Sequence, residues 1–196
     1  RSSDLFIPAI RGALARSPIH GMVTVSGYEG SELLVARLLI ESGATVPYVG
    51  TACPRTPWSE PDRVWLEAHG CEVQYRASLE QDLAAVDRHR PQLAIGTTPL
   101  VQACKQRGLP ALYFTNLISA RPLMGPAGAG SLAQVINGAI ANQARFDTMR
   151  DFFGDTGAGD KAGIWSDTPV LRPEFRADTR RQVIKIMKRR KAEEML

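Results

Sequence analysis

Short β-branched runs alternate with helical segments along residues 22–153, and this alternation restricts the fold more than any other feature of the chain. The predicted strands are 22–26, 45–51, 72–75, 92–95 and 111–114, and single segments with helical periodicity separate them. Strands joined through helices favour a parallel sheet, because each crossover returns the chain to the same edge. We therefore predict an α/β fold, a Rossmann-like doubly wound parallel sheet of four or five strands.

The chain is predicted to have three parts. Residues 1–20 mix apolar positions with prolines and a glycine, and we interpret them as a connector from an upstream domain. Residues 21–153 form the predicted sheet domain, and residues 154–196 form a loop followed by a basic helical tail. The first residue is Arg1 rather than Met, which favours a piece of a longer chain.

The positive charge is concentrated in this tail. Residues 172–196 hold nine basic and four acidic side chains, so the tail carries +5 and the rest of the chain −1. A nearly neutral body lacks the basic face of a nucleic-acid-binding domain, and we expect no nucleic-acid partner. The tail is either a solvated helix or a segment that docks on an acidic partner. The apolar runs are far shorter than the roughly 20 residues of a membrane span, so none is expected.

Two kinds of cofactor site are disfavoured by the residues themselves. The widely spaced Cys53, Cys71 and Cys104 form neither a metal motif nor a disulfide framework, which favours a reducing cytoplasm. The turn after the first strand, 27–30, is not a GxGxxG fingerprint. Its Tyr28 and Glu29 oppose a pyrophosphate. We therefore predict no metal site and no cofactor-binding site within this chain, and the catalytic residues stay unknown.

The segment that follows the fifth strand carries the strongest local signal. It is read as a loop from Thr115 to Gly125, before a helix that Ser131 caps and that runs to about Phe153. Ligands gather beyond the carboxyl ends of strands in doubly wound sheets. Apolar and amide side chains here suit a flat apolar ligand or, equally, an interface. The predicted substrate-binding residues are Phe114, Asn116, Leu117 and Met124.

At this point the chain resembles a known family. From Val23 to Gly138 it is similar to the C-terminal Rossmann-like domain of the nitrogenase component 1 family. The likeness rests on ESGA before VGT (41–51), on RPQLAIG (90–96) and on RGLP with the segment up to Gly125 (107–125). The runs 124–134, 163–165 and 172–176 resemble pigment-reducing members of that family.

The resemblance implies a catalytic component built from two different subunits, to which a separate ATP-dependent iron–sulfur protein delivers electrons. The implied reaction is reduction of a ring double bond of chlorophyllide a on the way to bacteriochlorophyll. A 4Fe-4S cluster is implied for the full complex with its ligands outside this chain, and ATP is implied only on the partner reductase. This piece by itself is expected to be inactive.

Thr115 argues against a nitrogen-fixing function for this chain. In the nitrogenase subunit that holds an iron–molybdenum cofactor, the family has a histidine ligand just after the equivalent strand. Thr115 stands there in this chain, and its hydroxyl is a poor ligand for such a cluster. Two other functions remain open on the residues alone. One is a nucleotide- or sugar-nucleotide-binding module, and the other is a purely structural assembly domain.

Overall fold

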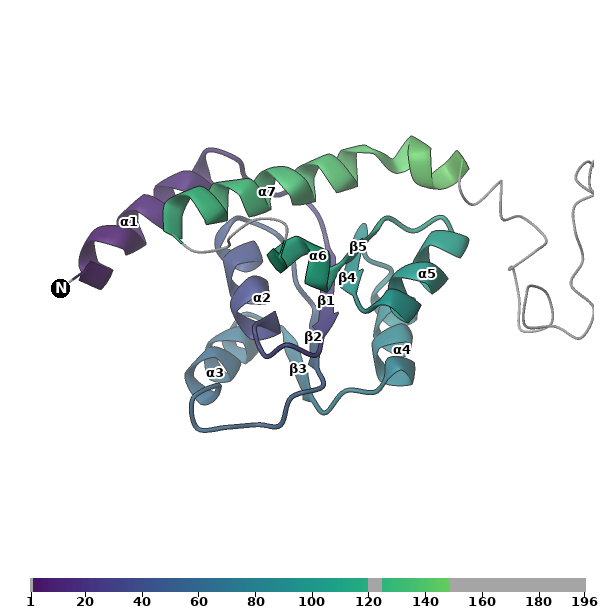
Figure 1. Ribbon diagram of the computed structural model, residues 1–196, viewed down its shortest axis with the longest axis horizontal. Coiled ribbons are helices and arrows are strands. Elements are labelled where there is room, and N and C mark those ends of the chain that lie inside the picture. The colour runs from purple at the N-terminus through teal and green to yellow at the C-terminus, as the bar shows by residue number, and fades with distance from the viewer. Residues whose placement is uncertain (1, 120–124, 149–196) are drawn as a thin grey trace, which may run out of the picture. The chain divides into compact units, whose positions relative to one another are not determined.

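The computed structural model describes residues 2–119 and 125–148 and confirms the parallel α/β fold (Figure 1). Five strands form one sheet in the order β3-β2-β1-β4-β5, and every pair is parallel. The predicted basic tail lies outside the described residues. The elements in chain order are α1 (Ser2–Ala15), β1 (Val23–Gly27), α2 (Glu32–Glu41), β2 (Tyr48–Thr51), α3 (Glu60–Ala68), β3 (Glu72–Tyr75), α4 (Leu79–His89), β4 (Leu93–Gly96), α5 (Thr98–Gln106), β5 (Ala111–Tyr113), α6 (Phe114–Ser119) and α7 (Gly125–Ala141).

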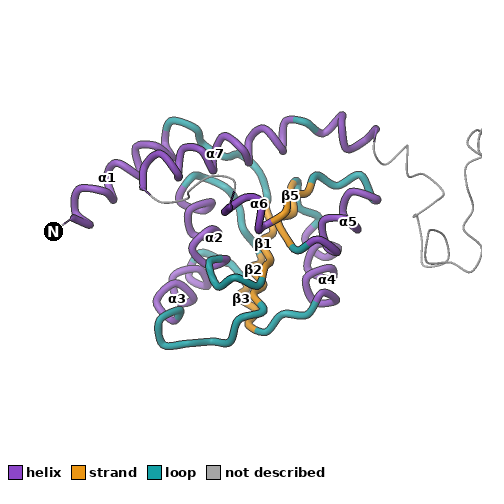
Figure 2. Tube along the Cα trace, in the orientation of Figure 1, coloured by secondary structure: helices purple, strands orange, loops and turns teal. Residues whose placement is uncertain are grey.

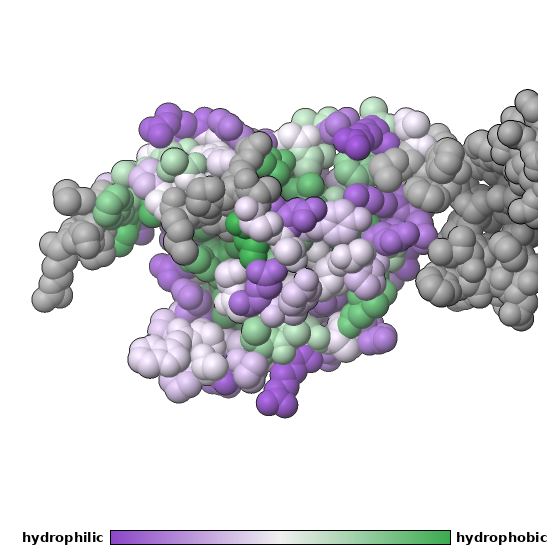
Figure 3. Space-filling view, viewed as in Figure 1, coloured by the Kyte–Doolittle hydropathy of each residue, from purple (hydrophilic) through white to green (hydrophobic). Residues whose placement is uncertain are grey.

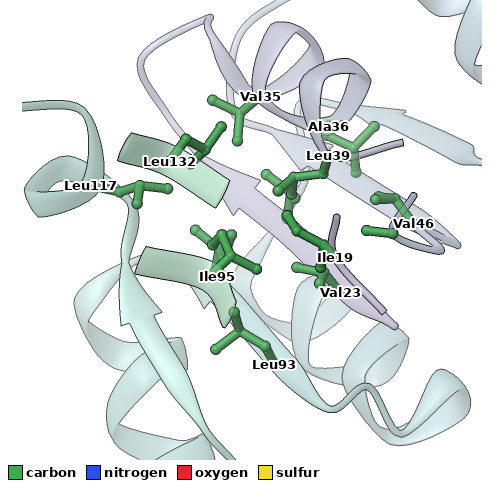
Figure 4. Close-up of a cluster of buried hydrophobic side chains, with 14 of the residues drawn as sticks. Ile19, Val23, Val35, Ala36, Leu39, Val46, Leu93, Ile95, Leu117 and Leu132 are labelled. Carbon is green, nitrogen blue, oxygen red and sulfur yellow. The ribbon is translucent and has the colours of Figure 1, made fainter. Parts of the chain in front are cut away.

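The central strand β1 is buried along its whole length, and helices cover both faces of the sheet. Figure 2 shows α2 and α3 on one side of the strands and α4 and α5 on the other. Val25 pairs with Val49 of β2 and with Ile95 of β4, which places three β-branched residues in one row. Side chains of β1, β4, α2 and α7 form the main core around these strands (Figure 4). A smaller cluster on the opposite face includes Ala94 and Leu100.

Local sequence signals position several of these elements. Ser78 and Gln81 form the capping box at the start of α4, with the Gln81 amide donating to Ser78 Oγ at 3.3 Å. Gly43 follows α2 with a φ of +100°, a conformation that glycine adopts without strain. Pro47 precedes β2, which lies between β1 and β3. The proline therefore marks the irregular start of an inner strand and not an edge strand.

The N-terminal segment is a continuous helix that packs in the same compact unit as the sheet. α1 extends through Pro8 and lies beside α7, as Figure 1 shows. Leu14 and Ile19 are 1% and 0% exposed and belong to the main core. Packing against α7 offsets the backbone hydrogen bond that Pro8 cannot make. A link to an upstream domain stays a prediction.

Two expectations about the chain after β5 are wrong. The segment from Phe114 to Ser119 is the helix α6 and not a loop, and α7 begins at Gly125, before Ser131. A proline in the first turn suits a helix start, and the small buried Gly128 and Ala129 let α7 pack closely. α7 ends at Ala141, a second helical stretch covers 143–148, and residues 149–153 lie outside the described part.

No helix in residues 2–119 and 125–148 has the length and apolarity that crossing a bilayer demands.

The packing of α1 predicts that Leu14→Ala lowers the free energy of unfolding by about 2–5 kcal/mol, because it leaves a cavity in the core. Phe6→Ala on the same helix is the matched control, since Phe6 is 54% exposed and should cost less than about 1 kcal/mol. Urea unfolding followed by circular dichroism measures both values. Equal small losses would mean that α1 contributes nothing to the core.

Candidate functional site

The carboxyl edge of the sheet brings together three segments that are far apart in the sequence. The Tyr28 hydroxyl, in the turn after β1, lies 3.2 Å from Thr115 Oγ1 at the start of α6. Cys53, in the loop after β2, directs its Sγ to the Tyr28 carbonyl at 3.7 Å. The Ala52 amide donates to the Gly27 carbonyl at 2.9 Å. The ends of β1, β2 and β5 therefore meet at one place, where doubly wound sheets hold ligands.

Glu32 is the anionic centre of this edge. It is the first residue of α2 and is 0% exposed. Its Oε1 accepts the Glu29 amide at 2.7 Å, and its Oε2 accepts the Gly30 amide at 2.9 Å and the Thr51 hydroxyl at 2.9 Å. Backbone amides at a helix start bind anions, so the carboxylate fills the position that a ligand phosphate takes in dinucleotide-binding folds.

Gly27 is required for this arrangement. A Cβ built at Gly27 would collide with Glu32 Oε1 and approach Glu32 Cγ to 3.0 Å. The glycine here therefore serves close packing of a side chain within the protein, whereas the glycines of a dinucleotide fingerprint let a pyrophosphate approach. The prediction that this turn does not hold a nucleotide now has a second physical reason besides Tyr28 and Glu29.

A cavity of about 290 Å³ lies beside β5. Asn116 and Leu117 of α6 line it, together with Tyr113, whose ring receives the Lys105 ammonium at 4.6 Å from its centroid. Val135 of α7 contributes to the apolar wall. A mixed apolar lining with one amide and one cation is typical of sites for flat ligands with polar edges.

The structure treats the four predicted substrate-binding residues differently. Asn116 is exposed, and Leu117 is 8% exposed and belongs also to the core. Phe114 is 1% exposed and lies in the core, because the chain enters α6 at this residue instead of continuing as a loop. Met124 lies outside the described residues. The structure thus brings two of the four to one cavity, and the binding role of all four stays a prediction.

A second buried acid lies near the end of β2. Asp82 of α4 is 5% exposed and accepts the Tyr48 hydroxyl at 2.8 Å. Burial, and to a smaller extent the charge of Glu32, raise the pKa of Asp82 to about 6, although the Tyr48 hydrogen bond opposes this rise. Burial and the neighbouring Asp82 carboxylate raise the pKa of Tyr48. Gly50 makes room for the pair, since a Cβ there would collide with Asp82 Oδ1.

The cysteines of the described part do not suit an iron–sulfur cluster. Burial raises the pKa of the Cys71 and Cys104 thiols to about 12, so both stay protonated at neutral pH. Residues 2–119 and 125–148 contain no group of three His, Cys, Asp or Glu side chains placed to hold a metal ion. Cluster ligation needs several thiolates at one place, so these residues do not fit the cluster that the family resemblance implies.

Figure 3 shows apolar patches next to polar side chains on the part of the α2 and α6 face that the coloured residues form. Singly exposed apolar residues are usual on protein surfaces.

Residues 6–141 match the family model described as Nitrogenase component 1 type Oxidoreductase. The chain is 66% identical over 195 residues to the "Chlorophyllide reductase 52.5 kDa chain" of Rhodobacter capsulatus. It is 64% identical over 195 residues to the protein of the same name from Cereibacter sphaeroides. Each alignment covers 100% of this chain and 39% of the relative, so the chain spans well under half the length of these relatives.

The solved structure "Nitrogenase Cp1 at pH 6.5" has the same fold, with a TM-score of 0.56. The superposition covers 86% of this chain and 35% of that chain, and the two are 17% identical. At this identity the likeness shows the fold alone.

The buried Asp82 predicts a pH-dependent stability. Its pKa in the folded protein, about 6, lies above its ordinary 3.8, so the unfolded state loses this proton first as the pH rises. Stability from this group therefore falls between about pH 4 and pH 6. Asp82→Asn keeps an acceptor for Tyr48 but does not titrate. Its free energy of unfolding, relative to that of the unchanged protein, should therefore rise by about 1–3 kcal/mol as the pH increases across this range. Urea unfolding at pH 4, 5, 6 and 7 measures the difference, which a pH-independent offset would contradict.

The carboxylate beneath the 27–30 turn predicts that NAD⁺ and FAD do not bind there, because Glu32 already occupies the amides. Isothermal titration of the purified chain should give no saturable heat with either compound. Binding at micromolar concentration that Glu32→Ala abolishes or enhances would place a nucleotide at the turn after all.

Proposed function

Because the chain belongs to the nitrogenase component 1 type oxidoreductase family, we propose that it is part of the catalytic component of a chlorophyllide a reductase. In this proposal it forms part of the Y subunit, which pairs with a Z subunit in a heterotetramer. An ATP-dependent iron–sulfur protein, the X subunit, supplies electrons. The complex reduces a ring double bond of chlorophyllide a in the cytoplasm during bacteriochlorophyll synthesis.

The observation that carries the proposal is the 66% identity along the whole of this chain to a protein named as a chlorophyllide reductase chain. Since the chain covers 39% of that protein, the activity belongs to a longer polypeptide and its partners. The 4Fe-4S cluster of the complex would take its ligands outside this chain, and ATP would bind only to the partner reductase. The isolated piece is then inactive.

The carboxyl edge and the β5 cavity support a pigment site. Thr115 and Tyr28 offer hydroxyl groups, which suit polar substituents on a tetrapyrrole better than they suit a metal cluster. The cavity volume of about 290 Å³ is at the lower end for ligand sites. It would hold one edge of the macrocycle through Asn116 and Leu117, with Met124 nearby in sequence and Phe114 supporting α6 from the core.

The alternative of a nucleotide-binding module loses support at the same edge. A bound phosphate would have to displace the Glu32 carboxylate from two amides, and it would lie beside Glu29. A purely structural assembly role leaves the site without a ligand. Binding of chlorophyllide therefore separates the proposal from both alternatives.

Asn116→Ala in the full-length reductase should raise the Michaelis constant for chlorophyllide about 2- to 12-fold, which corresponds to the loss of one hydrogen bond. Chlorophyllide consumption followed by absorbance measures the constant, and the cluster absorbance checks that the complex is intact. Ser119→Ala is the matched control on α6, because the Ser119 hydroxyl donates to the Thr115 carbonyl of its own helix.

The control should stay within twofold of the unchanged enzyme. If Asn116→Ala also stays within twofold, the β5 cavity does not take the pigment and serves packing or assembly. If the unchanged full-length complex does not reduce chlorophyllide, the proposed function itself is wrong.

A further inference from the structure

Within residues 2–119 and 125–148, no basic side chain pairs with the buried Glu32 carboxylate, and its partners there are two amides and one hydroxyl. Removing a carboxylate from water costs free energy unless hydrogen bonds replace the lost hydration. Its three donors meet this requirement, and hydrogen bonds to a charged acceptor are stronger than neutral ones.

These hydrogen bonds fix the backbone on the carboxyl side of Tyr28. The two amides that Glu32 accepts belong to Glu29 and Gly30, the residues that directly follow Tyr28. On the other side, the Gly27 carbonyl accepts the Ala52 amide of the neighbouring loop. The backbone of Tyr28 is thus held from both directions, by a carboxylate below the turn and by the end of β2.

Tyr28 is the side chain that gains from this rigidity. It is 56% exposed, yet its hydroxyl is held 3.2 Å from Thr115 Oγ1. The ring therefore extends from the end of β1 to the start of α6, across the edge where β4 ends between them in the sheet. An exposed tyrosine usually samples several rotamers, and ordering it before a ligand arrives lowers the entropic cost of binding.

The hydrogen bond between Tyr28 and Thr115 leaves one hydroxyl proton of the pair available to a ligand. A tyrosine hydroxyl both donates and accepts, and so does the threonine hydroxyl, so the pair keeps one donor free in either arrangement. The ring offers a flat apolar face, and the hydroxyl end is polar. A planar macrocycle with neutral carbonyl groups at its rim matches both properties.

We infer that Glu32 is a positioning residue, which holds the 27–30 turn so that Tyr28 contacts the tetrapyrrole at the carboxyl edge of the sheet. This inference rests on the proposed function, because it assigns the tetrapyrrole to that edge. Glu32 itself does not touch the pigment. It acts through the Glu29 and Gly30 amides, and the free hydroxyl proton of the Tyr28–Thr115 pair donates to an oxygen at the pigment rim.

A double-mutant cycle in the full-length reductase tests the inference. The variants are Glu32→Gln, Tyr28→Phe and the two combined, and the measurement is the dissociation constant of chlorophyllide from its absorbance change on titration. Gln keeps the shape of Glu32, but its amide group cannot accept both backbone N–H groups. We expect each single variant to raise the dissociation constant about 3- to 10-fold. The dissociation constant of the double variant should not exceed the larger of the two single-variant values.

Glu41→Gln is the matched control. It makes the same change of charge on the same helix, at the end remote from the turn, where Glu41 pairs with Arg37. Its dissociation constant should stay within twofold of the unchanged protein. An equal loss in Glu41→Gln would show that the charge of α2, and not the geometry of the turn, is what the pigment senses.

The cycle separates a positioning role from general stabilisation. If the two losses multiply in the double variant, Glu32 and Tyr28 act independently and the inference is wrong. It is equally wrong if Tyr28→Phe leaves the dissociation constant unchanged. Should Glu32→Gln fail to assemble, Gly27→Ala shifts the carboxylate without removing it and must weaken binding in the same way. If the unchanged complex binds no chlorophyllide, the proposed function fails together with the inference.

Discussion

Parallel pairing of the central strand β1 with β2 on one side and β4 on the other is the constraint on which this structure depends. A parallel sheet places all its carboxyl ends at one edge, so residues separated by 87 positions in the chain, Tyr28 and Thr115, come within hydrogen-bond distance. The same pairing buries both faces of β1 and thus requires helices on both sides. The position of the candidate site follows from the strand order, and the buried core around β1 holds the strand ends in place.

The electrostatics of that edge differ from those of a nucleotide-binding sheet. Instead of leaving amides for a phosphate, the chain supplies its own carboxylate from Glu32, and a second buried acid, Asp82, lies close enough for its pKa to respond. Two buried acids near one edge disfavour anionic ligands and favour neutral ones. This preference agrees with a large, mostly apolar pigment whose polar groups lie at its rim.

Much of the fold could be predicted because its signals are local. Strand and helix periods, the Ser78 capping box and the glycine after α2 each depend on a few neighbouring residues. The segment after β5 could not be predicted in the same way, since α6 and the start of α7 contain glycines and β-branched residues whose helical state is stabilised by packing. For the same reason α1, with Pro8 inside it, gave no clear signal of its place in the core.

The membership of the candidate site could be predicted only in part. Strand ends predict where a ligand gathers, and Asn116 and Leu117 line a cavity beside β5, while their binding role stays a prediction. Glu32 and Asp82 could not be found, because an acid in the first turn of a helix is usually solvated and only the three-dimensional structure shows these two buried. The bulk of Tyr28 is evident from the sequence, whereas its contact with Thr115 is a long-range consequence of the sheet order.

A structure of the full-length reductase with chlorophyllide bound tests the central claim most directly, namely that the pigment docks at the carboxyl edge of this sheet. The expected result is a macrocycle within about 4 Å of Tyr28 and Asn116, with the Glu32 carboxylate still bonded to the Glu29 and Gly30 amides. A pigment held entirely by other domains, with Tyr28 and Asn116 facing solvent, would contradict it.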